Sequence, residues 1–329
     1  MYEKEREAAC GIVAEACGLT RRVQDEIVET GDALTKDDRS PVTIADLAVQ
    51  LVVSRRLADA FPDDPLLAEE DSRAVAADPE SARRVLELAS GRLGSLDRTE
   101  MLAALDRSDH SGGGRYWVLD PIDGTKGFLR GDQYAVALAL VDGGRVVAGV
   151  VGCPNLDLGL PGAAGPGCLV SASRGAGARV RALAGGAEAA ARVDDVTEPA
   201  DAVLCESVEA AHSAHSVQGA VAARLGITAP PCRIDSQCKY AVVAAGRASV
   251  YLRLPRDPDY REKSWDHAAG SIVVEEAGGR VSDLDGRPLD FTRGRLLGTS
   301  RGIVCTNGKI HTALLEACRA ELGLSTLER

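Results

Sequence analysis

The stretch Tyr116–Gly131 reads YWVLDPIDGTKGFLRG, an apolar run that leads into two aspartates, a proline and two glycines. We interpret the apolar run as a buried strand, and strand ends are where sheets present functional groups. Pro121 fixes its own φ and bends the chain, so Asp120 and Asp123 are expected to turn toward one point. The carbonyl of Ile122 lies between them and is available as a further oxygen ligand.

The residues that follow suit an anionic group. Gly124 allows a close turn of the backbone, and Thr125 is expected to open a short helical turn whose N–H groups hold phosphate oxygens. Two carboxylates this close repel each other unless a cation lies between them, and hard oxygen ligands favour Mg²⁺ over zinc. The alternative is an Asx turn with a helix cap, which is the commoner meaning of an isolated Asp-x-x-Asp.

Further acids stand at the junctions of predicted elements. Glu69 follows the short strand candidate PLLA, Asp46 lies in the first turn of a helix expected over residues 42–61, and Asp266 precedes an apolar helix. Each has a structural alternative: Asp46 forms a capping box with Thr43, Asp266 is an N-cap, and Glu69 belongs to a solvated loop. Both interpretations stay open for each residue, because sequence spacing does not show convergence in space.

The 329 residues are 45% hydrophobic, enough for one large or two medium domains. Helical periodicity predicts helices at 2–30, 42–61, 208–225, 236–246 and 266–279, with a closing helix after residue 307 and polar helical surface segments within 72–114. Strands are expected at 65–68, 116–120, 202–207, 248–254 and 302–307, with a hairpin around Asp142-Gly143-Gly144. This mixed order indicates a layered α/β fold, which we divide into lobes of residues 1–197 and 198–329.

Charge and composition narrow the function. The net charge of −11 argues against a nucleic-acid groove but leaves a small anionic substrate open. No run approaches 18 apolar residues, and the N-terminal residues MYEKEREAACGIV lack the apolar core of a secretory signal. The nine cysteines show no Cys-x-x-Cys spacing. We therefore expect reduced core cysteines in an intracellular, soluble protein that makes no membrane contact and is a monomer or homodimer.

Several blocks of the chain resemble a known family. SPVTIAD, AEED, DPIDGTKGFLRGDQYAVALAL and WDHAAGSIVVEEAGG are similar to signatures of the inositol monophosphatase superfamily. ESVEAAHSAH, RIDSQCKY, YLRLP and REKSWDHAAG resemble its 3′(2′),5′-bisphosphate nucleotidases, especially the plant-type branch. The resemblance runs from about Tyr2 to Glu316 and is weakest at 72–114 and 157–200. It implies an alternating α-β-α-β-α sandwich of the inositol monophosphatase and fructose-1,6-bisphosphatase type.

The resemblance also implies a reaction. Members of this group use two or three Mg²⁺ ions to remove the 3′-phosphate of 3′-phosphoadenosine 5′-phosphate, giving AMP, and they accept the 5′-phosphosulfate analogue. The implied partner is therefore a small adenosine bisphosphate and no nucleic-acid polymer, with lithium sensitivity and a place in the chloroplast stroma or the cytoplasm. The alternatives are an inositol polyphosphate 1-phosphatase or inositol monophosphatase, and a non-catalytic nucleotide sensor.

Site residues follow from the resemblance motif by motif. The implied metal ligands are Glu69, Asp120, the Ile122 carbonyl, Asp123 and Asp266. The pair that orients and deprotonates the attacking water is Asp46 and Thr125. The implied substrate contacts are Gly124, Thr125, His212, Ser236, Lys239 and Arg253. For Lys239 and Arg253, ordinary surface charge is the alternative.

Two cysteines flank a loop rich in glycine and proline. Cys153 precedes it and Cys168 follows it, so the two thiols are able to meet. Because the plant-type branch is associated with redox sensitivity, a regulatory disulfide between them is one interpretation. The other is a pair of buried free thiols.

Overall fold

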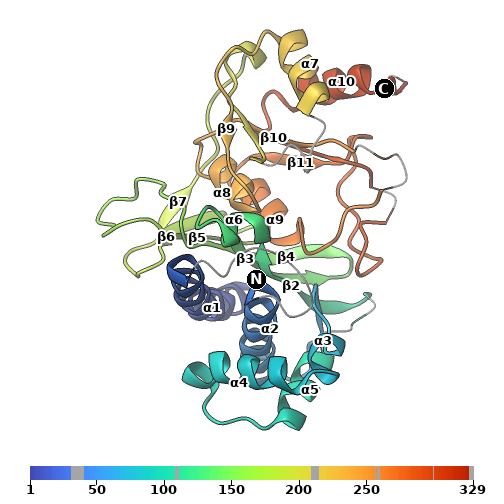
Figure 1. Cartoon of the computed structure of the whole chain (residues 1–329). Helices are drawn as coiled ribbons and strands as arrows, with labels where there is room; N and C mark the ends of the chain where they lie inside the picture. Colours follow the sequence, from blue (N-terminus) through green and yellow to red (C-terminus); the bar gives the residue numbers. More distant parts are fainter. Residues whose placement is uncertain are drawn as a thin grey trace.

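The computed structural model describes residues 1–30, 41–107, 110, 112–208, 215–255, 257, 260–298 and 300–325. Within these residues helices and sheets alternate in layers, from the N-terminal helices at one end of the molecule to the C-terminal helix at the other (Figure 1). This is the layered α/β architecture expected from the sequence.

Two sheets make up the β layers. The first has the order β1-β2-β3-β4-β5-β6-β7, with only β1 and β2 parallel among its neighbours. Its strands are Leu66–Ala68, Arg115–Asp123, Ala135–Asp142, Arg145–Cys153, Cys168–Ser173, Ala178–Ala182 and Ala189–Ala191. The second has the order β11-β12-β10-β8-β9. In that order its strands are Arg280–Ser282, Ile303–Thr306, Val250–Arg253, Leu204–Glu206 and Cys232–Arg233.

Helices cover both sheets. On one face of the first sheet lie α1 (Glu3–Thr30) and α2 (Pro41–Ala60), and α2 in turn carries α4 (Pro79–Leu93) and α5 (Arg98–Asp106), with α3 (Arg73–Ala76) against α4. Between the sheets lie α6 (Thr125–Leu129), α8 (Cys238–Ala244) and α9 (Ala268–Glu276) (Figure 1). The outer layer contains α7 (His215–Leu225) and α10 (His311–Glu321), with the 3₁₀ turn Pro199–Asp201 between the two sheets in the sequence.

The middle helix layer joins the two sheets tightly. Helix α9 packs against β3, β4 and β5 on one side and against β11 and β12 on the other. A Cβ atom on Gly149 of β4 would lie 2.5 Å from Ile272 and 3.2 Å from the Ala269 carbonyl, so this strand needs glycine where α9 crosses it. The division at residues 197 and 198 falls between the last strand of one sheet and the first of the other, and as a lobe boundary it stays a prediction.

Several sequence predictions are confirmed and three are corrected. The long first helix and the hairpin are present, and Gly143 and Gly144 have φ of 58° and 76°, as a type I′ turn requires. Helix α2 begins at Pro41, so Thr43 lies inside it and the predicted capping box is wrong. Residues 72–114 do form helices, but their Val85, Met101 and Leu105 side chains belong to the main core, which corrects their interpretation as a surface excursion.

The remaining correction concerns strands that the sequence did not reveal. The short strands β5, β6, β7, β9 and β11 were not predicted. These strands are only two to six residues long, and although β6 (ARVRA) alternates between apolar and charged residues, such short runs give a weak strand signal. The predicted helix over 208–225 is present from His215 onward, and residues 209–214 lie outside the described part of the chain.

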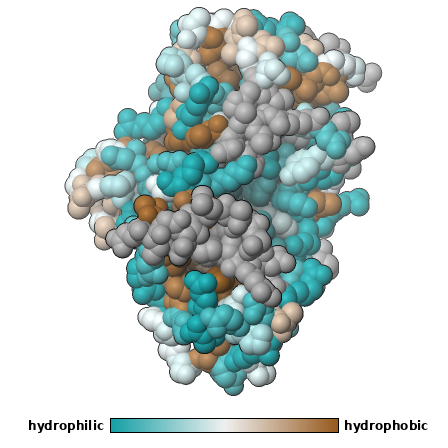
Figure 2. All heavy atoms as spheres, viewed as in Figure 1, coloured by the Kyte–Doolittle hydropathy of each residue, from teal (hydrophilic) through white to brown (hydrophobic). Residues whose placement is uncertain are grey.

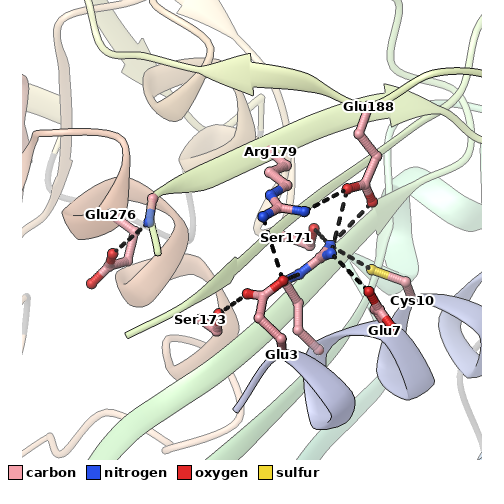
Figure 3. Close-up of polar contacts among 10 residues, drawn as sticks. Glu3, Glu7, Cys10, Ser171, Ser173, Arg179, Glu188 and Glu276 are labelled. Carbon is pink, nitrogen blue, oxygen red and sulfur yellow. Dashed lines mark hydrogen bonds and ion pairs between the residues drawn. The ribbon is translucent and has the colours of Figure 1, made fainter. Parts of the chain in front are cut away.

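A buried arginine fixes the start of α1 to the first sheet (Figure 3). Arg6 is 2% exposed and its Nη1 donates to Ser171 Oγ on β5 at 3.0 Å and to Glu188 Oε1 at 3.1 Å. Its Nε donates to Glu3 Oε2 at 3.2 Å, and Arg179 of β6 lies within 3.4 Å of both carboxylates. We call Glu3, Arg6, Ser171, Arg179 and Glu188 the Arg6 network. Its charges balance within the protein itself.

Among the described residues, no helix is both long and apolar enough to cross a bilayer. The face in Figure 2 is mostly hydrophilic, and its hydrophobic side chains form small separate patches.

Candidate active site

A bulge in β2 brings its two aspartates to one side. The strand continues through Asp123 instead of ending at Asp120, and it pairs with β3 as Asp120 with Ala137 and Asp123 with Ala135. Asp120 and Asp123 are three residues apart on β2, whereas their partners Ala137 and Ala135 are two residues apart on β3. In a regular strand the side chains of residues i and i+3 point to opposite faces, and one extra residue restores them to the same face. Pro121 fits within the bulge because it has no N–H to pair.

One cavity of about 610 Å³ collects most of the predicted site residues. Those that line it are Glu69, Asp120, Ile122, Asp123, Gly124, Thr125, Ser236, Lys239, Arg253 and Asp266. They come from the ends of β1 and β2, from α6, α8 and β10, and from the turn before α9. Segments separated by up to 197 residues (266 − 69) thus meet at one place between the sheets.

The acids in this cavity repel one another. Burial raises the pKa of Asp120 well above its ordinary value, and the charges of Glu69, Asp123, Asp266 and Asp46 raise it further. Burial and Asp266 likewise raise the pKa of Asp123 to about 6, although Lys239 and the backbone N–H of Gln237 oppose the shift. The nearby positive charges therefore do not offset the negative charges of the cavity's carboxylates.

This arrangement fits a divalent cation. Asp120 is 2% exposed, and its Oδ1 is buried without a hydrogen-bond partner among the described residues. A buried carboxylate oxygen without a donor is costly, and a hard cation removes both that cost and the repulsion between the acids. Glu69, Asp120, the Ile122 carbonyl, Asp123 and Asp266 are the oxygens available to it around the cavity.

Thr125 lines the cavity and Asp46 does not. Thr125 is the first residue of α6, and its hydroxyl donates to the Ile122 carbonyl at 3.4 Å. Asp46 of α2 is 1% exposed and does not line the cavity, although its charge acts on Asp120. The structure therefore places Asp46 behind the acids and Thr125 at the cavity wall.

Gly124 and Ser236 touch where β2 meets α8. Gly124 has φ of 88°, and a Cβ atom on it would lie 2.8 Å from the Ser236 Cβ. Ser236 itself has φ of 67°, an uncommon conformation for a residue with a Cβ. The β2–α6 segment and the segment before α8 therefore approach each other closely at this part of the cavity wall.

Lys239 is buried, so the alternative of ordinary surface charge is wrong for this residue. It is 4% exposed, its Nζ donates to the Ile234 carbonyl at 3.3 Å, and it lies 5.2 Å from the centroid of the Tyr251 ring. Burial lowers its pKa, and the nearby Asp123 opposes that shift. A buried amine in a cavity wall is chemically suited to bind an anion.

Arg253 is engaged by acids rather than exposed. Its Nη2 donates to Asp266 Oδ2 at 2.9 Å, and its Nε lies 2.8 Å from Glu262 Oε2. The ligand atoms of Glu262, Asp266 and His267 lie within 4.8 Å of one another, but His267 Nε2 also lies 3.2 Å from Glu262. Glu262 is thus a partner for Arg253 and His267, which leaves Asp266 as the acid that faces the cavity.

Two further sets of predicted residues remain to be described. His212 lies outside the described residues. Cys153 and Cys168 are direct partners in the β4–β5 pairing and are free and buried, and burial raises the pKa of Cys153. Such a thiol is a poor nucleophile, and the redox role stays a prediction.

Sequence reasoning missed other parts of the wall. The cavity also contacts Lys126, Ser207, Asp235, Gln237, Tyr251, Tyr260, Lys263 and Trp265. Except for Tyr260, each of them stands inside a block quoted for the resemblance; Asp235 and Gln237, for example, flank Ser236 in RIDSQCKY. Lys263 and Trp265 precede Asp266 in the same way, but nothing in their spacing distinguishes a wall residue from a core residue.

Known proteins resemble this chain along its whole length. The model of the inositol monophosphatase family matches residues 1–322. A 3′(2′),5′-bisphosphate nucleotidase of Oryza sativa is 44% identical, covering 96% of this chain and 94% of that protein. One of Schizosaccharomyces pombe is 42% identical, covering 97% and 96%.

Solved structures agree with these sequences. Mycobacterium tuberculosis SuhB has a TM-score of 0.63 at 25% identity and covers 97% of both chains. An inositol monophosphatase from Anabaena has a TM-score of 0.59 at 22% identity, covering 95% of this chain and 96% of its own, and this likeness concerns the fold. By sequence and by fold, the chain belongs to the inositol monophosphatase family.

Proposed function

We propose that this chain is a Mg²⁺-dependent phosphatase that removes the 3′-phosphate of 3′-phosphoadenosine 5′-phosphate, giving AMP and phosphate. The 5′-phosphosulfate analogue would give adenosine 5′-phosphosulfate in the same way. The observation that supports this most is a single cavity whose wall holds both the carboxylates and two basic side chains, Lys239 and Arg253. Relatives at 42% and 44% identity that bear the name 3′(2′),5′-bisphosphate nucleotidase support the choice of substrate.

The acids are assigned to metal binding. Two or three Mg²⁺ ions would be held by Glu69, Asp120, the Ile122 carbonyl, Asp123 and Asp266, all of which line the cavity. When bound, Mg²⁺ supplies a more acidic water and neutralises charge on the phosphate and the leaving oxygen. We assign the removal of the water's proton to Asp46 acting through the hydroxyl of Thr125, which lines the cavity and would orient that water.

The basic and hydroxyl side chains of the cavity wall are assigned to the nucleotide. Lys239 is held by burial in a fixed place, which suits a 5′-phosphate because little side-chain entropy is lost on binding. Arg253 offers a planar group beside it, and Ser236 a hydroxyl. The amides after Gly124 add donors for the 3′-phosphate, although α6 has only five residues and so contributes a small dipole.

The test is a phosphate-release screen of the purified chain with Mg²⁺. We expect turnover of 3′-phosphoadenosine 5′-phosphate to exceed that of adenosine 3′-phosphate, which lacks the 5′-phosphate, by at least tenfold in kcat/KM. Lys239→Met should reduce this ratio, whereas Lys309→Met, in a remote ion pair with Asp195, should leave it unchanged. EDTA should abolish turnover.

Other results would point elsewhere. Preferred turnover of inositol 1,4-bisphosphate would replace the nucleotide by an inositol phosphate. Nucleotide binding without phosphate release would make the chain a sensor. Arg253→Ala does not separate these substrates, because Arg253 also contacts Asp266 and its loss would disturb metal binding for every substrate.

The remaining expectations are also proposals. Inhibition by lithium follows if a small monovalent cation displaces a weakly held Mg²⁺. A monomer or homodimer in the cytoplasm or the chloroplast stroma would suit a small nucleotide substrate, and mass photometry and fractionation would test those points.

A further inference from the structure

Three of the acids in the cavity wall, Glu69, Asp123 and Asp266, stand on segments that are far apart in the sequence. Asp123 ends β2, Glu69 follows β1, and Asp266 lies in the turn before α9. The parallel pairing of β1 with β2 holds the segments of Glu69 and Asp123 side by side, and further contacts join them to the segment of Asp266. The described residues contain one continuous set of such contacts, made by Gln237, Trp265 and Arg295.

Arg295 joins the segment of Glu69 to that of Asp266. Its Nη1 donates to the Ala68 carbonyl at 3.3 Å and its Nη2 to the Glu69 carbonyl at 3.1 Å. Its guanidinium also lies over the Trp265 ring, with Cζ 4.7 Å from the centroid. A planar cation that stacks on one segment and donates twice to another is a cross-link that lysine reproduces only in part.

The backbone around Arg295 is itself fixed. The N–H of Ser264 donates to the Arg295 carbonyl at 3.0 Å, and the N–H of Leu297 donates to the Glu262 carbonyl at 2.9 Å. Lys263 and Leu296 form an antiparallel bridge between these bonds. The arginine therefore projects from a short ladder that contains the residues just before Asp266.

Gln237 joins the segment of Asp266 to that of Asp123. Its backbone N–H donates to Asp123 Oδ2 at 2.6 Å. Its side chain, 1% exposed, donates through Nε2 to the Trp265 carbonyl at 2.8 Å and accepts from the Gly270 N–H at 2.9 Å. Both ends of the amide are used, so no other side chain of similar size makes the same pair of bonds.

Strain marks the same place. Ser236, directly before Gln237, has φ of 67°, and non-glycine residues persist in that region only when their surroundings hold them there. The uncommon conformation aims the Gln237 N–H at the Asp123 carboxylate.

We propose that Gln237 and Arg295, acting through Trp265, are positioning residues that set the separation of Glu69, Asp123 and Asp266 for divalent cations. This rests on the proposed function and deepens it. Neither side chain is assigned to substrate or to a cation; each acts through the segment that it holds. Residues of this kind typically change metal affinity by about 10–100-fold when lost.

The experiment measures Mg²⁺ binding directly, by isothermal titration calorimetry of the nucleotide-free chain, beside steady-state kinetics. We expect Arg295→Met to weaken Mg²⁺ binding by about tenfold and to raise the Mg²⁺ concentration for half-maximal activity equally. At saturating Mg²⁺, kcat and the KM for the nucleotide should stay within about twofold, because the cavity wall around the nucleotide is unchanged. Gln237→Glu, which loses the donor to Trp265, should behave likewise.

Two further variants make the test decisive. Arg295→Lys keeps the charge and one hydrogen bond, so it should fold and lose about threefold in Mg²⁺ affinity. Arg293→Met, at an exposed position on the same segment, should bind Mg²⁺ as the unaltered chain does. Normal Mg²⁺ affinity in a folded Arg295→Met or Arg295→Lys chain would overturn the proposal, as would equal weakening in Arg293→Met.

The proposed function fails separately. If the unaltered chain binds Mg²⁺ and the Arg295 variants bind it more weakly, but no nucleotide is hydrolysed, the positioning role stands and the proposed reaction does not. Failure of the unaltered chain to bind Mg²⁺ would overturn both.

Discussion

Arg6 and Asp120 are both buried charged side chains, each 2% exposed, yet their surroundings differ in kind. The guanidinium of Arg6 lies within 4.0 Å of three carboxylates, those of Glu3, Glu7 and Glu188, and it also donates to the Ser171 hydroxyl. The carboxylate of Asp120 meets other carboxylates, and its Oδ1 has no donor among the described residues. The charge of Arg6 is paired with opposite charges, whereas the charge of Asp120 lies among like charges.

The pKa shifts report the same contrast. Burial alone would raise the pKa of Glu188, but the bonds from Arg6 and Arg179 outweigh burial and the pKa lies below its ordinary value. In the cavity, burial and neighbouring acids act in the same direction on Asp123. The ion-paired acids of the Arg6 network have lowered pKa values, whereas the crowded acids Asp120 and Asp123 have raised ones.

The largest expected effect comes from Asp123→Asn. Loss of one ligand charge should reduce phosphate release by about a thousandfold or more, as removal of transition-state charge stabilisation does elsewhere. The variant should nevertheless fold at least as stably without metal, because one repelling charge is gone. Steady-state kinetics and urea unfolding in EDTA measure the two quantities. Unchanged activity would remove the cavity from the reaction.

The next effect concerns Arg6→Met, which should lower the free energy of unfolding by about 2–3 kcal/mol. That is less than the usual cost of breaking a buried pair, since Glu3 and Glu188 are 37% and 30% exposed and regain water. Activity per folded molecule should not change, because the network lies apart from the cavity residues. Urea unfolding checks the first point and an active-site-normalised assay the second. A selective loss of activity would contradict the contrast.

A pH series distinguishes the regions further. The folded pKa of Asp123 is about 6 against an ordinary 3.8, so below pH 6 the folded chain binds more protons than the unfolded one. Stability of the metal-free chain should therefore fall as pH rises from about 4 to 6. The advantage of Asp123→Asn should grow over that range by about 2 kcal/mol and then level off.

The Arg6 network supplies the control for that series. The pKa values of Glu3 and Glu188 are lowered, so both acids stay ionised and the cost of Arg6→Met should be constant between about pH 5 and 8. Unfolding titrations at fixed ionic strength measure both differences. A constant advantage for Asp123→Asn at all pH values would show that Asp123 is not crowded.

The smallest effect should come from Arg179→Met. Arg179 contacts the same two carboxylates as Arg6 but is 38% exposed, so water competes for each bond. We expect a loss below about 1 kcal/mol in urea unfolding. A cost equal to that of Arg6→Met would mean that charge balance, and not burial, sets the strength of the network.

Particular residues show how far sequence reasoning reached. The helix at 2–30 and the hairpin at Asp142-Gly143-Gly144 were predictable, because each depends on contacts within a few residues. The short strands β5 to β7 were not, because their pairing depends on neighbours across the sheet. The capping box at Thr43 failed since Pro41 opened the helix earlier.

The candidate site divides in the same way. The block DPIDGT placed Asp120, Ile122, Asp123 and Thr125 together, since they are neighbours in the chain. That Arg295 reaches back to the Glu69 carbonyl, 226 residues away, has no local signature at all. An arginine that stacks on a tryptophan looks in sequence like any charged surface residue.

The sequence by itself determined the layered order of helices and strands, the acid-rich end of β2 and the family, because periodicity, turn chemistry and short motifs are local properties. Only the tertiary structure decided that the acids crowd one another, that Lys239 is buried, and that Gln237 and Arg295 hold the acid-bearing segments. The reason is physical: repulsion, desolvation and long-range hydrogen bonds depend on distances that exist only after the sheets and helices have packed.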